Sequence, residues 1–244
     1  MGREKRINQP GFIYHVINRG NNRQAVFFDE EDFLKYLGLL YRFKKKYEFK
    51  LFAYCLMTNH VHLLIKVGTK GTISQIMQSL TVAHTRHYHI KYQRCGHVWQ
   101  GRFTSPIISD DAHLLTVMRY IEQNPLRAKM VKDLAAYRWS SYRLNSREQR
   151  SKLIDRGDND VYMGLGDTDT EQIKTYQDLM RESVPEMELT AIRSSVKTGI
   201  GYMSEKFRQQ IAGILPQKRK RGRPRINGVN SPQTQTMTPE KDRN

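Results

Sequence analysis

Two histidines separated by one residue are the first group in this sequence whose type and spacing suit a chemical task. His60 and His62 flank Val61, and an apolar run follows them. On a strand, alternate side chains share a face, so both imidazoles would lie on one side of a sheet, about 7 Å apart. Two imidazoles can hold one metal ion if a third ligand comes from elsewhere. The same pair is also compatible with hydrogen-bonded surface groups that bind no metal.

Tyr120 and Asn124 form a second group, four residues apart in a segment with a helical pattern. Residues at this spacing share a helix face. A tyrosine aimed at phosphorus can attack a phosphodiester when the phosphate charge is neutralised. A metal held by the two histidines and the Asn124 oxygen would neutralise it. Two alternatives stay open: Asn124 before Pro125 is typical of a helix start, and Tyr120 is one of 13 tyrosines that can be buried aromatics.

The elements that must position these residues alternate between strand and helix patterns. We expect a strand at 11–18, a helix at 30–47 capped by Asp29, a hairpin of strands 51–57 and 60–67, a helix at 72–91, a short hairpin at 97–103, an edge strand at 105–108, and a helix from Asp110 or Asp111 through Ile121. The order β-α-β-β-α-β is the split βαβ arrangement. It predicts an α+β domain with an antiparallel sheet, one face packed on helices and the other face open.

Basic residues dominate one part of the chain. Lys and Arg outnumber Asp and Glu by 41 to 24; residues 1–145 carry 23 basic and 10 acidic side chains, and residues 146–215 carry 10 and 12. Such asymmetry is typical of nucleic-acid binders, although a basic protein without a polyanionic partner has the same composition. Cys55 and Cys95 are too few for a disulfide framework or a four-Cys zinc site. Without an apolar signal segment or an apolar run of about 20 residues, we expect a cytoplasmic protein.

The C-terminal third has a different character. Residues 146–166 are polar, and three short helices are expected at 170–182, 188–195 and 204–214. These helices suit either a cap on the main domain or a small DNA-binding unit, and their net negative charge favours the cap. The string Arg221-Gly222-Arg223-Pro224 suits the minor groove of A·T-rich DNA, but a generic basic tail explains it as well. Residues 226–244 have the composition of a disordered segment.

Four strings, in this order and at this spacing, resemble the REP-associated tyrosine transposases. This family is related to the single-strand insertion-sequence transposases with the His-hydrophobe-His (HUH) signature. The strings are residues 57–64, 98–103, 119–128 and 139–142. The resemblance covers residues 8–145, which we interpret as an HUH tyrosine transposase domain. A helical C-terminal extension at 146–215 and a basic tail at 216–244, expected to be disordered, would follow it.

The resemblance implies a ferredoxin-like sheet with helices and a divalent metal, Mg²⁺ or Mn²⁺. His60 and His62 would be metal ligands, and Asn124 the third ligand, where relatives often have Gln. Tyr120 would cut single-stranded DNA, leaving a 5′-phosphotyrosine and a free 3′-OH. The substrates would be hairpins of repetitive extragenic palindromes, and the protein would act as a monomer or homodimer in the nucleoid. Because imidazole pairs suit Zn²⁺ or Ni²⁺ better than Mg²⁺, we expect weak metal binding without DNA.

Several basic and aromatic side chains are candidates for DNA contact. They are Arg19, Arg23, Arg102 and Arg127, the aromatic residues Trp99 and Phe103 on the expected hairpin tip, and Arg221 and Arg223 in the tail. Solvated charges and buried aromatic anchors are the ordinary alternatives. Two other functions compete: a non-catalytic binder of palindromic DNA, such as a repressor or chromosome organiser, and a metal hydrolase with an activated water. The combined His-x-His and Tyr-x₃-Asn patterns favour the transposase, because a pure binder needs neither.

Overall fold

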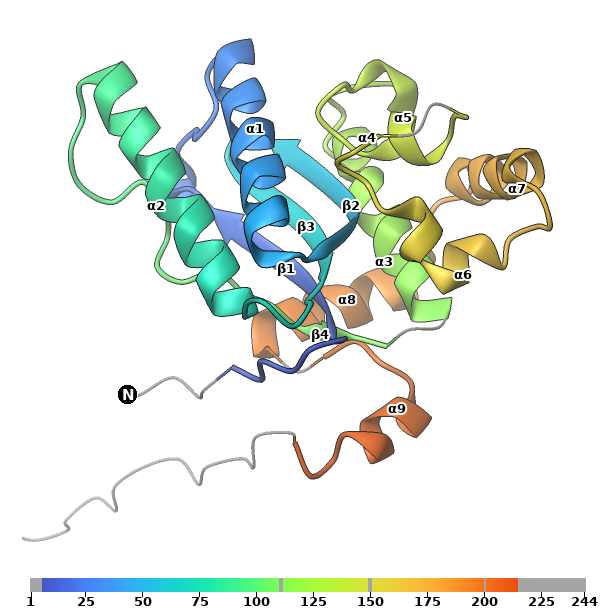
Figure 1. Ribbon diagram of the computed structural model, residues 1–244. Coiled ribbons are helices and arrows are strands. Elements are labelled where there is room, and N and C mark those ends of the chain that lie inside the picture. Colours follow the sequence, from blue (N-terminus) through green and yellow to red (C-terminus); the bar gives the residue numbers. More distant parts are fainter. Residues whose placement is uncertain (1–5, 110–111, 149–150, 200, 215–244) are drawn as a thin grey trace, which may run out of the picture.

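One four-stranded sheet forms the centre of the protein, seen in a computed structural model that describes residues 6–109, 112–148, 151–199 and 201–214 (Figure 1). Its strands lie in the order β2-β3-β1-β4, and all neighbours are antiparallel. The strands are β1 (Ile13–Arg19), β2 (Lys50–Met57), β3 (His60–Lys66) and β4 (Ile107–Ile108). This is the strand order of the ferredoxin-like fold. The predicted α+β class with an antiparallel, ferredoxin-like sheet is therefore confirmed.

Two long helices, α1 (Glu30–Tyr47) and α2 (Ile73–Tyr92), cover one face of the sheet (Figure 1). Asp29 caps α1 by accepting a hydrogen bond from the backbone N–H of Asp32, and Thr72 begins α2 with a capping box. Their apolar stripes pack with Val61, Leu63 and Ile65 of β3 in one core cluster. The predicted limits of α1 are confirmed, and those of α2 agree to within one residue.

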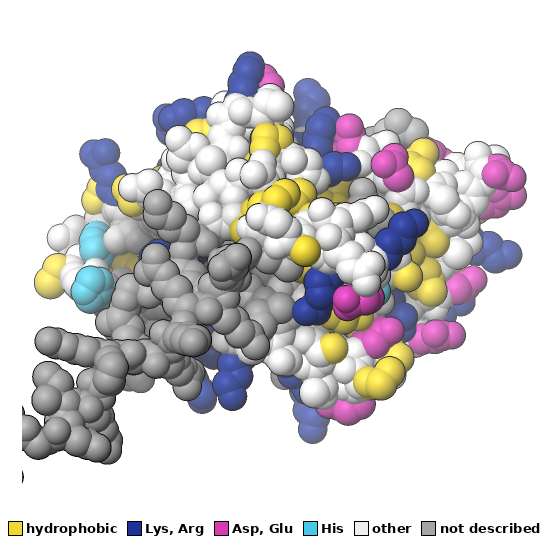
Figure 2. All heavy atoms as spheres, turned by 90° about the horizontal axis from the view of Figure 1, so that it is seen from below, with side chains coloured by type: hydrophobic (Ala, Val, Ile, Leu, Met, Phe, Trp, Pro, Cys, Tyr) yellow, Lys and Arg dark blue, Asp and Glu magenta, His cyan; other side chains and the backbone are white. Residues whose placement is uncertain are grey.

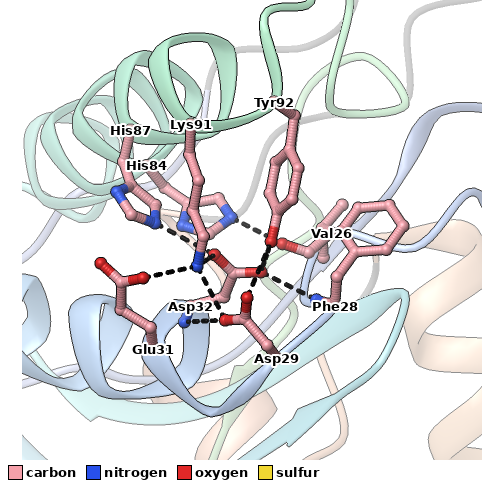
Figure 3. Close-up of polar contacts among 9 residues, drawn as sticks. All are labelled: Val26, Phe28, Asp29, Glu31, Asp32, His84, His87, Lys91 and Tyr92. Carbon is pink, nitrogen blue, oxygen red and sulfur yellow. Dashed lines mark hydrogen bonds and ion pairs between the residues drawn. The ribbon is translucent and has the colours of Figure 1, made fainter.

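A network centred on Asp32 joins α1 to α2 (Figure 3). The Asp32 carboxylate accepts hydrogen bonds from the Phe28 backbone N–H at 2.8 Å and the Tyr92 hydroxyl at 2.6 Å. His87 Nε2 and Lys91 Nζ contact its other oxygen at 3.0 and 3.2 Å. Burial raises the pKa of this carboxyl, but the hydrogen bonds outweigh burial and hold the pKa at about 2. The network therefore keeps a buried charge that ties the two helices together.

The opposite face of the sheet is covered by α3 (Ala112–Glu122), which packs on β2 and β3. Ala53, Cys55 and Leu64 on this face share a core cluster with the apolar side of α3. The predicted open face is therefore wrong. The sequence held a signal for this, because β2 is a nearly continuous apolar run with seven of its eight residues buried, a pattern typical of strands covered on both sides.

The expected hairpin at 97–103 is also wrong. This segment pairs with β1 instead, through isolated bridges between Gly20 and Trp99 and between Ile17 and Thr104. The Gln100 N–H donates to the Arg19 carbonyl at 2.8 Å. Because β4 is only two residues long, the free edge of β1 would otherwise be exposed, and the segment satisfies its backbone groups. The edge position predicted for the strand after Pro106 is confirmed.

The C-terminal extension packs on α3. Two short helices precede the extension, α4 (Asn124–Arg127) and α5 (Tyr142–Asn145). The extension itself contains α6 (Asp160–Met163), α7 (Asp169–Arg181), α8 (Glu186–Thr198) and α9 (Glu205–Gln210). Short 3₁₀ turns lie at Asn21–Arg23, Leu134–Ala136 and Arg156–Asp158. Tyr176 on α7 is fully buried and donates to the Glu122 carboxylate at 2.8 Å. Arg119 and Gln123 donate to backbone carbonyls at 180–183. The extension therefore holds the last turn of α3 from outside, as the cap interpretation expected.

Some predicted features lie outside the described residues: the Asp110 or Asp111 cap, and the tail with Arg221 and Arg223. Within the described ranges, no helix is both long enough and apolar enough to span a membrane.

Candidate active site

His60 and His62 are the first and third residues of β3, next to the turn, and both lie on the face covered by α3. Their ring centroids are 5.0 Å apart. In the register of the sheet His60 lies beside Met57 of β2 and Arg19 of β1, and His62 lies beside Cys55 and Ile17. His62 is buried, at 4% exposure, and His60 is half-buried. The alternation along β3 therefore brings the two imidazoles together, with one edge still open.

Each of these rings has one nitrogen engaged and one left over. His60 Nδ1 lies 2.6 Å from Asn59 Oδ1 and donates to it, because the Asn59 Nδ2 is directed to the Arg23 carbonyl. His62 Nδ1 lies 2.9 Å from His15 Nε2. In the described part of the chain, neither Nε2 has a hydrogen-bond partner. Metal-binding histidines usually show this arrangement, with the remote nitrogen oriented by a partner and the other nitrogen free for the ion.

Burial also sets the protonation of the pair. It lowers the pKa of His60 to about 4, and the charge of Arg19 adds to the effect. It holds the pKa of His62 well below its usual range, with smaller contributions from His15 and His60. Both rings are therefore neutral at pH 7 and keep the lone pair that a metal ion requires.

Tyr120 lies against these histidines from α3. The centroid of its ring is 5.8 Å from that of His62 and 5.6 Å from that of His15, both in edge-on geometry. The Arg127 guanidinium covers the ring at 4.4 Å and donates to the Tyr120 carbonyl. The apolar stripe of α3 is buried against the sheet, and Tyr120 stays half-buried at its flank. The helix thus brings the Tyr120 ring to His62 and His15.

Asn124 lies one turn further along the same helical path. Its Nδ2 donates to the carbonyls of Tyr120 and Ile121, at 2.9 and 3.2 Å. Since both partners are acceptors, the amide nitrogen must face them and Oδ1 is left free. A new helix, α4, does start at Asn124, as the alternative interpretation of Asn124-Pro125 expected, but Gln123 holds the N-cap position and the Asn124 side chain donates rather than accepts, so it does not cap this helix.

A metal at this site would need a third ligand other than a histidine or a carboxylate. Among the residues described, no three His, Cys, Asp or Glu side chains are grouped to hold an ion. The free Oδ1 of Asn124 is an oxygen ligand at the start of α4, directly after the helix that carries Tyr120. Two neutral imidazoles and one amide fit a divalent cation held weakly, without a carboxylate to neutralise its charge.

The candidate DNA-contact residues divide between two sides of the sheet. Arg19 and Arg23 are exposed near His60, and Arg127 is half-buried over Tyr120. Trp99 and Phe103 are only 9% exposed and pack in the core of the opposite side. The prediction that these two rings stand on an exposed hairpin tip is therefore wrong, and the alternative of a buried anchor describes them.

A cavity of about 860 Å³ lies between α2 and the segment 96–103. Arg6, Arg86 and Arg102 line it, with Trp99 and Phe103 in its wall, and none of its lining residues is acidic. On the face seen in Figure 2, acidic side chains gather over the half that holds the C-terminal helices, while histidines lie on the other half.

His15 is the residue that sequence reasoning missed. It is fully buried on β1, its ring stacked 5.2 Å from that of His62. The pattern of β1 shows that His15 and Ile17 share a face, but not that this strand pairs with β3. The pairing of β1 with β3 is what joins His15 to the pair on β3.

Comparison with known proteins identifies a family for the domain. Residues 8–124 match the model of the family described as "Transposase IS200 like". Among solved structures, a REP-associated tyrosine transposase bound to a REP hairpin is similar over 64% of this chain and 94% of its own, with 16% identity and a TM-score of 0.53. A protein assigned as a transposase from Deinococcus radiodurans has 21% identity over 53% of this chain and 91% of its own, but its TM-score of 0.34 is too low to carry an argument. No curated protein matches the chain significantly.

Proposed function

Because residues 8–124 place this chain in the IS200-like transposase family, we propose that it cleaves and rejoins single-stranded DNA with Tyr120 as the nucleophile. The observation that carries the proposal is the contact of the Tyr120 ring with His62, whose Nε2 is free. A buried aromatic kept only for packing has no need of two neutral imidazoles beside it.

The reaction is a phosphoryl transfer. The phenol oxygen of Tyr120 forms a bond to phosphorus as its proton leaves to solvent. The bond from phosphorus to the 3′ oxygen breaks, and that oxygen takes a proton to give a free 3′-OH. The strand that begins at the cut is then joined to Tyr120 through its 5′-phosphate. Attack by another 3′-OH reverses the step and restores the phenol. Arg127, stacked on the ring, keeps the phenol in place.

His60, His62 and Asn124 would hold a divalent cation, Mg²⁺ or Mn²⁺, through their free Nε2 and Oδ1 atoms. When bound, the cation neutralises the phosphate charge and aligns it for attack. The protein's part is to present the ligands in fixed orientation: Asn59 and His15 hold the imidazoles, and the backbone of α3 holds Asn124. The donor set favours tight binding only when DNA phosphate adds further oxygen ligands.

The substrate we propose is a hairpin of the repetitive extragenic palindrome type. The similar REP-associated transposase was solved bound to such a hairpin. Arg19, Arg23 and Arg127 would position phosphates at the cut. Arg102 would act at the cavity beside α2, and Arg221 and Arg223 from the tail.

The domain division of 8–145, 146–215 and 216–244 also remains a proposal. The hydrogen bonds from 176–183 to α3 support an extension that steadies the helix bearing Tyr120. We propose that the enzyme acts on the nucleoid in the cytoplasm, where its DNA substrates lie.

Hairpin DNA labelled at either end tests the proposal. Single-stranded hairpins carrying the host's palindromic repeat are incubated with the protein and Mn²⁺ and separated on a denaturing protein gel. We expect only the 3′-labelled strand to migrate with the protein, and Tyr120→Phe to lose the shift while binding the hairpin normally. Cleavage by Tyr120→Phe would contradict the assignment of the nucleophile. Free ends without any protein-linked strand would instead indicate hydrolysis by water, and tight binding of every repeat tried without cleavage would indicate a non-catalytic binder.

A further inference from the structure

His15 lies between the proposed metal ligand and the proposed nucleophile. Its Nε2 is 2.9 Å from His62 Nδ1, and its ring meets the edge of the Tyr120 ring with centroids 5.6 Å apart. No water reaches it, since its exposure is 0%. A histidine at this position therefore touches both halves of the site without facing the substrate.

The register of the sheet explains the contact. Ile17 of β1 lies directly opposite His62 of β3, so His15 is its diagonal neighbour on the same face. Diagonal neighbours in antiparallel strands are about 7–8 Å apart at the backbone, within reach of ring side chains. The contact is set by β1 and β3, the two central strands, and is independent of the loops around the site.

A metal bound through Nε2 decides which nitrogen of His62 carries the proton. The lone pair of Nε2 is then used for the ion, so the proton must sit on Nδ1 and needs an acceptor. In the part of the chain that the structure describes, the only hydrogen-bond partner of His62 Nδ1 is His15 Nε2. We propose that His15 is a positioning residue that accepts the Nδ1–H of His62, and so fixes the ring and the tautomer that bind the metal. This rests on the proposed metal-dependent cleavage.

Stability does not account for a histidine here. The second nitrogen of His15, Nδ1, is buried without a hydrogen-bond partner in the described residues. A buried polar atom without a partner lowers stability, because no hydrogen bond replaces the one it made to water. An apolar side chain of similar size would avoid this loss, so a residue selected only for packing would not be histidine. The contact with His62 is what the imidazole adds.

Asn and Gln at position 15 make a matched pair for the test. The Gln Oε1 reaches about as far as the Nε2 of histidine, whereas the Asn Oδ1 reaches only as far as Nδ1. Both variants keep a neutral amide, and they differ in whether an acceptor reaches His62. His15→Leu removes the acceptor altogether. His84→Gln changes another buried histidine, one that donates to the Val26 carbonyl on the other face of the sheet, and serves as the control.

Mn²⁺ binding is measured on the full chain by electron paramagnetic resonance, with and without hairpin DNA, and thermal unfolding is recorded for each variant. We expect His15→Asn and His15→Leu to bind Mn²⁺ about 10–100-fold more weakly, the range found when such an orienting partner is lost. His15→Gln should stay within a few-fold of the native protein, and His84→Gln should keep the native Mn²⁺ affinity. The melting temperature of His15→Leu should equal or exceed the native value.

Two results would overturn the proposal: native Mn²⁺ affinity in folded His15→Asn or His15→Leu, or equal loss in the Gln and Asn variants. If His15→Leu does not fold, the Gln and Asn pair still decides. The proposed metal site is tested separately. It is wrong if the native protein binds no Mn²⁺, or if His62→Ala does not abolish the binding. The nucleophile is judged separately, by the protein-linked strand that Tyr120→Phe should lose.

Discussion

Two clusters of histidine and neighbouring polar groups lie on opposite faces of the same sheet, and they differ in how many hydrogen-bonding atoms are already used. Between α1 and α2, the Asp32 carboxylate accepts four contacts, from Phe28, His87, Lys91 and Tyr92 (Figure 3). Below α3, His60 and His62 each keep an Nε2 without a hydrogen-bond partner among the described residues.

The contrast separates structural from functional burial. A carboxylate whose oxygens are saturated has nothing left for a ligand, so the Asp32 cluster stabilises the fold. An oriented imidazole with a free lone pair contributes less to stability but can bind an ion. Buried histidines occur in both clusters, so burial and lowered pKa values alone do not identify the site.

The largest effect should come from removing a free lone pair. His62→Ala is expected to lower the rate of strand cleavage about 10³-fold, because a bound metal supplies several kcal/mol of charge stabilisation. Because the variant removes a buried ring, its free energy of unfolding should fall by about 2–3 kcal/mol, as in other large-to-small core changes. Single-turnover cleavage and urea unfolding measure the two quantities. Native cleavage by the variant would remove the distinction between the clusters.

Glu122 extends the comparison, because it lies on the same side of the sheet as His60 and His62, yet both of its carboxylate oxygens accept hydrogen bonds, as those of Asp32 do. Ser141, Asn145 and Tyr176 donate to it, but burial dominates and raises its pKa to about 7. A raised carboxyl pKa means that stability is highest below pH 4.5 and falls as pH rises through 7. The native protein should lose about 3 kcal/mol across that window.

Glu122→Gln should not show that loss of stability with pH, and its cleavage rate should remain close to native. Urea unfolding of both proteins at pH 5 and pH 8 measures the difference. Equal pH dependence in the two proteins would show that Glu122 does not titrate in this range.

Asp32→Asn tests the saturated cluster in the opposite pH direction. The pKa of Asp32 is about 2, below its ordinary value of 3.8. Its stabilisation is therefore fully present above pH 4 and is lost as pH falls through 2. The variant should be about 2 kcal/mol less stable than the native protein at pH 7, and the difference should shrink toward pH 2. Cleavage by the folded variant at pH 7 should be native, and a large loss of cleavage would link the two clusters.

The smallest effect concerns Asn124. Its Nδ2 anchors to the Tyr120 carbonyl, while Oδ1 is free for a metal. Asn124→Asp keeps the oxygen and loses the donor, and Asn124→Ala loses both. If Oδ1 is the ligand, Asn124→Ala should cleave about tenfold more slowly at limiting Mn²⁺, and Asn124→Asp should retain Mn²⁺ dependence near native. If both variants lose the same amount of cleavage activity, Asn124 acts only through its hydrogen bonds to the backbone of α3.

Local patterns in the sequence determined much of the fold. The apolar periods and caps predicted α1 with its limits at 30–47 and the hairpin of β2 and β3, because helix and strand periods act over a few residues. Alternation along β3 predicted that His60 and His62 share a face. The spacing of Tyr120 and Asn124 predicted that the two side chains lie on the same side of a helical segment. These are properties of neighbours along the chain, and a sequence displays them directly.

Tertiary structure alone decided which strands and helices meet. Pairing of β1 with β3 brings His15 to His62, and packing of α3 on the second face brings Tyr120 to both. Trp99 and Phe103 are buried on the other side of the sheet, in the core that α1 and α2 cover, and the extension packs against Glu122. Strand partners and sheet faces depend on contacts between residues about 50 to 100 positions apart, which no local period records. The sequence thus named the residues that we propose react, and the register of the sheet supplied the histidine that we propose orients one of them.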